Sequence, residues 1–180
     1  DYEAALALEQ AEMGIIPQAA ADEIVACARI ERLDMGLVLE QVRLTKHPLV
    51  PTIRALEDAC SGGFGEYVHF GPTTQDVMDT GMVLQLRMAH KIILRDIKEI
   101  CRSLLELSEK HRNTPMAGRT LALQAIPITF GHKTAIWLAE LMRHHERLIQ
   151  LEPRLFVGSV VGAVGTKASF GERADELEER

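Results

Sequence analysis

Apolar residues recur at helical spacing through most of this chain. Ala4, Leu8 and Ala11 stand at i, i+4 and i+7, which predicts a helix over residues 2–13. Three more short helical segments are expected after it, around residues 21–30, 35–42 and 49–59. A glycine-rich loop then closes this first set of helices.

A much longer helical pattern follows. From Met78 to Leu107 apolar residues step by three or four positions without a break, and neither Gly nor Pro interrupts residues 82–113. A helix of about 30 residues is about 45 Å long. Additional apolar residues beside this row widen the stripe, which is typical of a helix that is covered on more than one side in a bundle.

The remainder of the pattern contains a loop-like segment, another long helix and a stretch of small residues. Pro115 ends the first long helix, a loop is expected over residues 116–128, and a second long helix over residues 130–151. Residues 157–168 are rich in glycine and small side chains. That composition suits close approach of the backbone to a ligand or to another helix.

Together these patterns predict an all-α chain in two parts. Residues 1–75 form a small N-terminal helical domain, and residues 76–180 form part of a long-helix bundle. The polar tail from Gly171 has neither a C-cap nor an apolar partner face, and Asp1 falls inside an apparent helix. The sequence therefore predicts a piece of a longer protein, with the bundle domain truncated at its C-terminus.

Composition and charge argue against several classes of protein. The chain is 47% hydrophobic and 26% charged, and its net charge of -6 offers no electrostatic attraction to nucleic acid. No apolar stretch reaches the ~18 residues that a membrane span requires. The three cysteines lie far apart without metal-binding spacing. A reducing cytoplasm is therefore the expected location, with no disulfide framework.

The segment His69-x-Gly-x-Thr-Thr-x-Asp is the first candidate for a site. It places an imidazole, two hydroxyls, an amide and a carboxylate at the start of the long helix, through His69, Thr73, Thr74, Gln75 and Asp76. Helix N-termini attract carboxylates and phosphates through their free N–H groups. The alternative is an ordinary helix cap with a turn, in which Thr74 or Asp76 is the cap.

His47 is the second candidate. Pro48 disfavours helical backbone at the residue before it, so His47 lies at a break between helices. An imidazole titrates close to neutral pH, which suits a general acid or base. The alternative is a surface histidine at a proline turn.

Two further polar clusters leave alternatives open. Arg119 and Thr120, with Gln124, stand in an otherwise apolar segment. An arginine fork binds carboxylates well, but the same groups also serve to satisfy loop backbone. The run from Gly162 to Thr166 does not match the glycine motifs of nucleotide-binding loops. It suits either tight helix packing or an anion contact by Thr166.

Three motifs in a fixed order carry a family resemblance. HFGPTTQDVMDTG, MAGRTLALQAIPITFGHKTAIW and GAVGTKA occur in this order, separated by the two long helical patterns. This arrangement resembles the fumarase/aspartase superfamily, on its adenylosuccinate lyase and 3-carboxy-cis,cis-muconate cycloisomerase side. The resemblance extends from LEQAEMGIIP near the start of the chain to GTKASFGE near its end.

The resemblance implies a fold and an activity. Members are homotetramers of long helices, and each active site is assembled from three subunits. They carry out anti β-elimination, or its reverse, next to a carboxylate of a small polycarboxylate substrate, and require no metal or organic cofactor. Fumarate is the usual product, whereas the cycloisomerase branch closes a lactone.

By position in the motifs, the resemblance implies three catalytic residues, His47, His69 and Gln124. The substrate-binding residues that it implies are Thr73, Thr74, Gln75, Asp76, Arg119, Thr120 and Thr166. A dianionic intermediate needs such hydroxyls, amides and cationic groups aimed at it.

The chain also departs from the family pattern. Leu121 and Gln124 stand where adenylosuccinate lyases have histidines, and Thr74 replaces a serine. A serine-rich mobile loop that carries the presumed catalytic serine is expected beyond Arg180, so residues 1–180 alone are predicted to be inactive. The alternative to an enzyme is a helical structural protein that kept the fold and lost catalysis.

Overall fold

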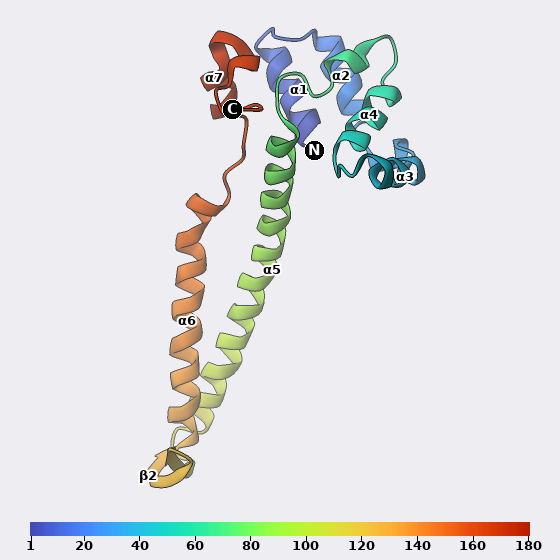
Figure 1. Cartoon of the computed structure of the whole chain (residues 1–180). Helices are drawn as coiled ribbons and strands as arrows, with labels where there is room; N and C mark the ends of the chain where they lie inside the picture. Colours follow the sequence, from blue (N-terminus) through green and yellow to red (C-terminus); the bar gives the residue numbers. More distant parts are fainter. The chain divides into compact units, whose positions relative to one another are not determined.

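The computed structural model describes all residues, 1–180, and the chain forms two compact units. The first unit contains residues 1–83 and 158–180, and the second contains residues 84–157. Helix α5 (Thr74–Lys110) begins in the first unit and continues into the second (Figure 1). The predicted division into domains 1–75 and 76–180 stays a prediction.

Short helices build the first unit. They are α1 (Tyr2–Glu12), α2 (Gln18–Cys27), α3 (Met35–Thr45), α4 (Val50–Ala59) and α7 (Ala174–Glu179), with 3-10 turns η1 (Ile30–Arg32), η2 (Phe64–Tyr67) and η3 (Ala168–Arg173). Helices α1, α2 and α4 share one core with the residue that follows η2. Its buried members are Ala7, Ile16, Ala21, Ile24, Cys27, Ile53, Leu56 and Val68. The predicted series of short helices is confirmed.

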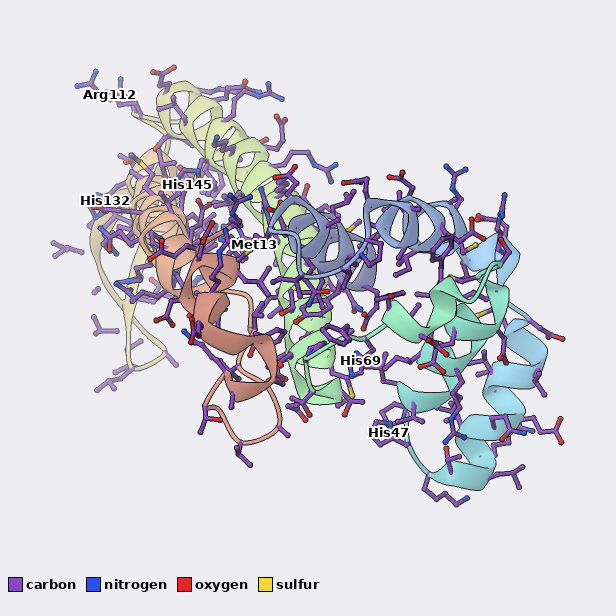
Figure 2. The ribbon with its side chains drawn as sticks, turned by 90° about the horizontal axis from the view of Figure 1, so that it is seen from above. Met13, His47, His69, Arg112, His132 and His145 are labelled. Atoms are coloured by element: carbon purple, nitrogen blue, oxygen red, sulfur yellow. The ribbon has the colours of Figure 1, made fainter.

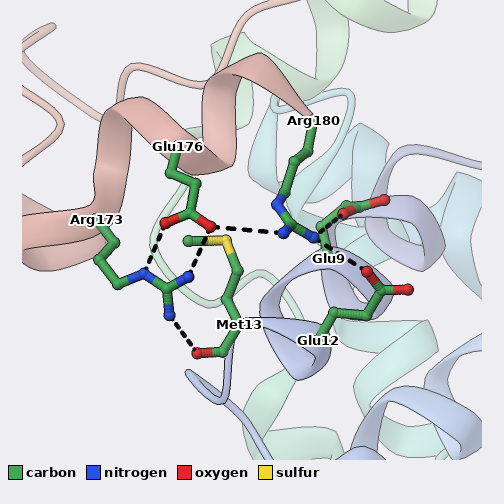
Figure 3. Close-up of polar contacts among 6 residues, drawn as sticks. All are labelled: Glu9, Glu12, Met13, Arg173, Glu176 and Arg180. Atoms are coloured by element: carbon green, nitrogen blue, oxygen red, sulfur yellow. Dashed lines mark hydrogen bonds and ion pairs between the residues drawn. The ribbon is translucent and has the colours of Figure 1, made fainter.

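A second core joins the C-terminal tail to α1, and it corrects the prediction that the tail has no apolar partner face. Its buried members are Leu6, Met13, Phe170, Ala174 and Leu177. Burial of several such side chains outweighs the polar composition of the tail. Figure 3 shows the polar rim of this contact, where Arg173 donates to the Met13 carbonyl at 2.8 Å and Arg180 pairs with Glu12 at 3.0 Å.

The second unit contains the rest of α5, a β-hairpin and α6 (Phe130–Leu155). The hairpin consists of β1 (Pro115–Thr120) and β2 (Leu123–Thr129), paired antiparallel. The predicted loop over residues 116–128 was therefore wrong. Leu121 and Ala122 form a two-residue connection with φ of 48° and 63°. Tight hairpin turns of this kind usually carry Asn or Gly, so the turn gave no signal in the sequence.

Apart from this hairpin every regular element is helical, so the expected all-α class is confirmed. None of the helices combines the length and the apolar character needed to cross a bilayer.

Gly131 permits a close backbone approach between the start of α6 and the C-terminal end of α5. A Cβ atom at this position would lie 2.5 Å from the Ser108 carbonyl oxygen and 2.8 Å from the Arg112 Cα atom. The Ser108 hydroxyl donates to the Gly131 carbonyl at 2.7 Å, and this bond holds the two helices together at their contact.

We expect Gly131→Ala to lower the free energy of unfolding of the complete protein by at least about 2 kcal/mol, because backbone atoms cannot move aside as a side chain can. Urea unfolding measures this change. Gly81→Ala is the matched control, since a Cβ there meets nothing within 4 Å of its own chain. Equal stability of the Gly131 variant and the wild type would contradict the prediction.

Candidate active site

A buried carboxylate organises the start of α5. Asp76 is 1% exposed and accepts four hydrogen bonds. One comes from the Thr73 N–H at 3.0 Å, which is a capping contact of the helix. The other three come from the glycine-rich segment, and their donors are the Ser159 hydroxyl at 2.7 Å, the Gly162 N–H at 2.9 Å and the Val161 N–H at 3.3 Å.

Two opposing effects act on the pKa of Asp76. Burial is the largest single effect, and it raises the pKa by disfavouring the charged form. The hydrogen bonds from Thr73, Ser159, Gly162 and Val161 together outweigh burial and hold the pKa below its ordinary value. The Asp76 carboxylate is therefore ionised, and its hydrogen bonds join the start of α5 to residues 159–162. Direct contact of Asp76 with substrate stays a prediction.

The residues directly after the glycine-rich segment also pack against the His69 motif, next to two glycines. Gly71 has φ of 104°, and a Cβ there would lie 2.7 Å from the Phe170 ring. Gly162 is buried, and a Cβ there would lie 3.0 Å from the Ser169 hydroxyl oxygen, which itself hydrogen-bonds the Gly71 carbonyl. Two of the three sequence motifs thus form one structure in the first unit.

His47 caps the start of α4 and reaches the start of α5. Its Nδ1 accepts hydrogen bonds from the backbone N–H groups of Leu49 at 3.2 Å and Val50 at 3.1 Å. These contacts assign the ring proton to Nε2, which lies 3.5 Å from the Thr74 hydroxyl oxygen. His47 therefore presents an N–H donor beside Thr74.

His69 has the opposite arrangement. Its Nδ1 lies 2.7 Å from Glu3 Oε1, and its backbone N–H donates to Glu3 Oε2 at 3.0 Å. The carboxylate can only accept, so Nδ1 carries a proton, and in the neutral imidazole Nε2 is left as an acceptor. Figure 2 labels both histidines, which lie on the segments that precede α4 and α5.

Sequence reasoning missed the contribution of α1. Besides Glu3, the Tyr2 hydroxyl donates to the Ser159 carbonyl at 3.0 Å, and Gln10 Nε2 donates to the Phe70 carbonyl at 2.7 Å. Burial, with the nearby Asp76 and Glu3 carboxylates, raises the pKa of Tyr2 far above its ordinary value, so its phenol remains a donor. A signal was present, because Glu3 and Gln10 stand at i and i+7 on the buried face of α1.

The remaining predicted residues of the first unit are not fixed by contacts of this kind. Gln75 is exposed and bonds Asp79 at 2.7 Å, one helical turn away. Thr166 is exposed, and Thr73 uses its backbone N–H as the bond to Asp76. The hydroxyls of Thr73 and Thr166 are thus available to a ligand.

The third predicted cluster lies in the other unit. Arg119, Thr120 and Gln124 are exposed on the hairpin, where Arg119 pairs with Gln124 and Thr120 with Leu123 in the strand register. The structure therefore brings these three residues together on one hairpin, and it places His47 and His69 in the first unit.

The first unit also has a cavity that lies outside the predicted site. A cavity of about 510 Å³ is lined mainly by apolar side chains and by Glu3, but by none of the predicted site residues. The chain has no group of three or more His, Cys, Asp or Glu side chains that could hold a metal ion.

The chain matches a protein-family model over almost its whole length. A family described as Lyase matches residues 2–178. The chain belongs to this lyase family. The resemblance to adenylosuccinate lyase and carboxymuconate cycloisomerase is confirmed, since relatives with both names match nearly the whole chain.

Curated relatives in this lyase family have different names. The chain is 49% identical to N-acetyl-S-(2-succino)cysteine lyase of Enterococcus italicus, covering 98% of this chain and 38% of that protein. It is 43% identical to adenylosuccinate lyase of Methanocaldococcus jannaschii, covering 99% and 38%. For 3-carboxy-cis,cis-muconate cycloisomerase of Pseudomonas aeruginosa the identity is 41%, covering 97% and 39%. The chain thus spans about two fifths of the length of these relatives.

Solved structures of the lyase family share the fold. Fumarate lyase from Mesorhizobium sp. BNC1 has a TM-score of 0.93 at 42% identity, covering 98% of this chain and 42% of that one. The 3-carboxy-cis,cis-muconate lactonizing enzyme from Pseudomonas putida has a TM-score of 0.94 at 39% identity, covering 99% and 41%. These relatives are named as enzymes, so the comparisons do not support the alternative of a structural protein without catalysis.

The hydrogen bonds of Asp76 predict how the stability of the protein depends on this carboxylate and on pH. We expect Asp76→Asn to cost about 2–3 kcal/mol at neutral pH, because its amide NH2 faces donors and the charge-assisted bonds are lost. The folded-state pKa of Asp76 lies below its ordinary value of 3.8. The stabilisation is therefore complete above the unfolded-state pKa and is lost as pH falls through the folded-state pKa.

Thermal unfolding of the complete wild type and variant across acidic pH measures this difference. The gap between the two should be constant above about pH 5 and shrink below the ordinary Asp pKa. Asp79→Asn is a control, because Asp79 accepts a bond from Gln75 on the exposed side of the same helix. A gap that stays constant at every pH would show that the Asp76 charge is not the source of the stabilisation.

Proposed function

We propose that the complete protein is a lyase that eliminates fumarate from a succinyl-substituted polycarboxylate. The observation that carries this proposal is the opposite proton placement on the two histidines. His47 offers an Nε2–H donor beside Thr74, whereas His69 offers an unprotonated Nε2. One donor and one acceptor are what acid–base catalysis of an elimination requires.

In this reaction a base removes the proton from the carbon next to one carboxylate. The electron pair of that C–H bond forms the carbon–carbon double bond of fumarate, and the bond from the neighbouring carbon to sulfur or nitrogen breaks. The leaving atom then receives a proton. We assign His47 to proton donation or substrate binding and His69 to proton transfer at Nε2. A serine-rich loop outside residues 1–180 is a second candidate for the base.

Hydroxyls and amides of the predicted site fit the carboxylates of such a substrate. We propose that Thr73, Thr74, Gln75 and Thr166 bind them in the first unit, with Asp76 also retained as a predicted contact. We propose that Arg119, Thr120 and Gln124 bind substrate from the hairpin, through charge-assisted and neutral hydrogen bonds.

Two curated relatives of the chain favour a thioether substrate. Two proteins named N-acetyl-S-(2-succino)cysteine lyase, from Enterococcus italicus and Dickeya dadantii, are 49% and 47% identical to this chain. A thiol has an ordinary pKa of about 8.5 and leaves as a thiolate with little help. That chemistry fits Leu121 and Gln124, which replace the histidines expected for a nitrogen leaving group. Adenylosuccinate and carboxymuconate are the other two candidates.

We further propose that the complete protein is a homotetramer with shared active sites. Support comes from large apolar side chains of the second unit that are exposed in the single chain. Leu121 is 96% exposed and Ile126 is 79% exposed on the hairpin, and Trp137 and Met142 are exposed on α6. Exposed patches of this kind mark protein contacts. We also propose the cytoplasm as its location, because its three cysteines are free.

The substrate is tested with the complete gene product and three compounds. We expect N-acetyl-S-(2-succino)cysteine to release fumarate, measured by ultraviolet absorbance, together with one equivalent of free thiol. Faster fumarate release from adenylosuccinate, or lactone formation from 3-carboxy-cis,cis-muconate, would reassign the substrate within the family. Failure with all three would contradict the proposed substrate class. Turnover by residues 1–180 alone would contradict the prediction that this piece is inactive.

The role of His69 is tested by His69→Ala in the complete protein. We expect kcat to fall by about 100-fold to 10,000-fold, the range for loss of a proton-transfer group, while the variant still folds. His144→Ala is the control, since the His144 side chain is 50% exposed on α6. Near-normal turnover of the His69 variant would remove His69 from the catalytic residues.

A further inference from the structure

We propose that Glu3 is the positioning residue of His69 and sets which ring nitrogen carries the proton. This inference rests on the proposed function, in which His69 transfers a proton at Nε2. Glu3 is not a catalytic residue in this proposal, because its carboxylate contacts His69 and acts through it. No motif of the sequence marks Glu3, which lies 66 residues before His69.

The contact is a bridge from one carboxylate to two groups of the same residue. Glu3 Oε1 lies 2.7 Å from the ring Nδ1 of His69, and Oε2 accepts the His69 backbone N–H at 3.0 Å. Both side chains are shielded from water, with 11% of Glu3 and 16% of His69 exposed. A shielded charge-assisted bond of this length is strong and directional.

The backbone of His69 makes the bridge more specific. His69 has φ of 57°, a left-handed conformation that residues other than glycine adopt infrequently. This conformation turns its N–H toward the same carboxylate that holds the ring. The bridge therefore fixes the orientation of the imidazole as well as its tautomer.

Two other residues of α1 fix the helix that carries Glu3. The Tyr2 hydroxyl bonds the Ser159 carbonyl, and Gln10 bonds the carbonyl of Phe70, the residue next to His69. These contacts tie α1 to both motif segments on either side of Glu3. The carboxylate is thus in place before substrate arrives, as a positioning residue requires.

Chemistry distinguishes a carboxylate from an amide at this position. A carboxylate accepts only, so it keeps the proton on Nδ1 and leaves Nε2 free. An amide can turn its NH2 toward Nδ1, which moves the ring proton to Nε2. Glu3→Gln therefore changes the tautomer of His69 while preserving the size of the side chain.

The experiment uses the complete protein with Glu3→Gln, Glu3→Asp and the control Glu12→Gln. Glu12 lies on the same helix and pairs with Arg180 at the surface (Figure 3). We expect Glu3→Gln to lower kcat by about 100-fold or more, as a wrong tautomer does in other histidine enzymes. We expect KM to change less than threefold and the melting temperature to stay close to the wild type. Glu3→Asp keeps a carboxylate and should recover part of kcat, and Glu12→Gln should match the wild type.

The ¹⁵N spectrum of histidine-labelled protein supplies the reading that a structural role would not change. We expect the His69 proton on Nδ1 in the wild type and in Glu3→Asp, and on Nε2 in Glu3→Gln. A Glu3→Gln variant with kcat within threefold of wild type, or with the proton still on Nδ1, overturns the proposal. If no substrate reacts with the wild type, the proposed function fails, and the tautomer comparison still decides the role of Glu3.

Discussion

A carboxylate without access to water must find its hydrogen bonds inside the protein, because an unpaired buried charge is very costly. Asp76 satisfies this requirement with one donor from its own helix start and three from residues 159–162, more than 80 positions later. The first unit therefore depends on these four hydrogen bonds. They bring the motif at His69 and the motif at Gly162 into one structure, and the glycines at their contact allow the backbones to approach.

Next to the Asp76 hydrogen bonds, helix α1 supplies contacts that orient the segments of the candidate site. Its apolar residues join two cores, while Tyr2, Glu3 and Gln10 bond the segments that carry the site. His47 is oriented independently by the first N–H groups of α4. Two imidazoles with different partners at Nδ1 thus both present Nε2, protonated in His47 and unprotonated in His69, and this division into donor and acceptor follows from local geometry.

The second unit has a different relation between sequence and structure. Its hairpin is short and exposed, and the turn at Leu121 and Ala122 uses left-handed backbone at two residues with side chains. Such backbone costs about 1–2 kcal/mol for each residue. In the proposed tetramer, contacts of the exposed apolar residues with other copies would offset that cost.

The sequence by itself determined the helices and the family. An unbroken apolar repeat from Met78 to Leu107 is compatible with one regular structure, a long helix, and three ordered motifs indicate the lyase family. The sequence did not show the hairpin, because Leu121 and Ala122 carry no turn signal. Nor did it show the Glu3–His69 bridge, although the helical spacing of Glu3 and Gln10 marked a polar buried face. Only the tertiary structure decided these contacts, because periodicity reports the neighbours of a residue along the chain, whereas a contact across 66 residues depends on the path of everything between.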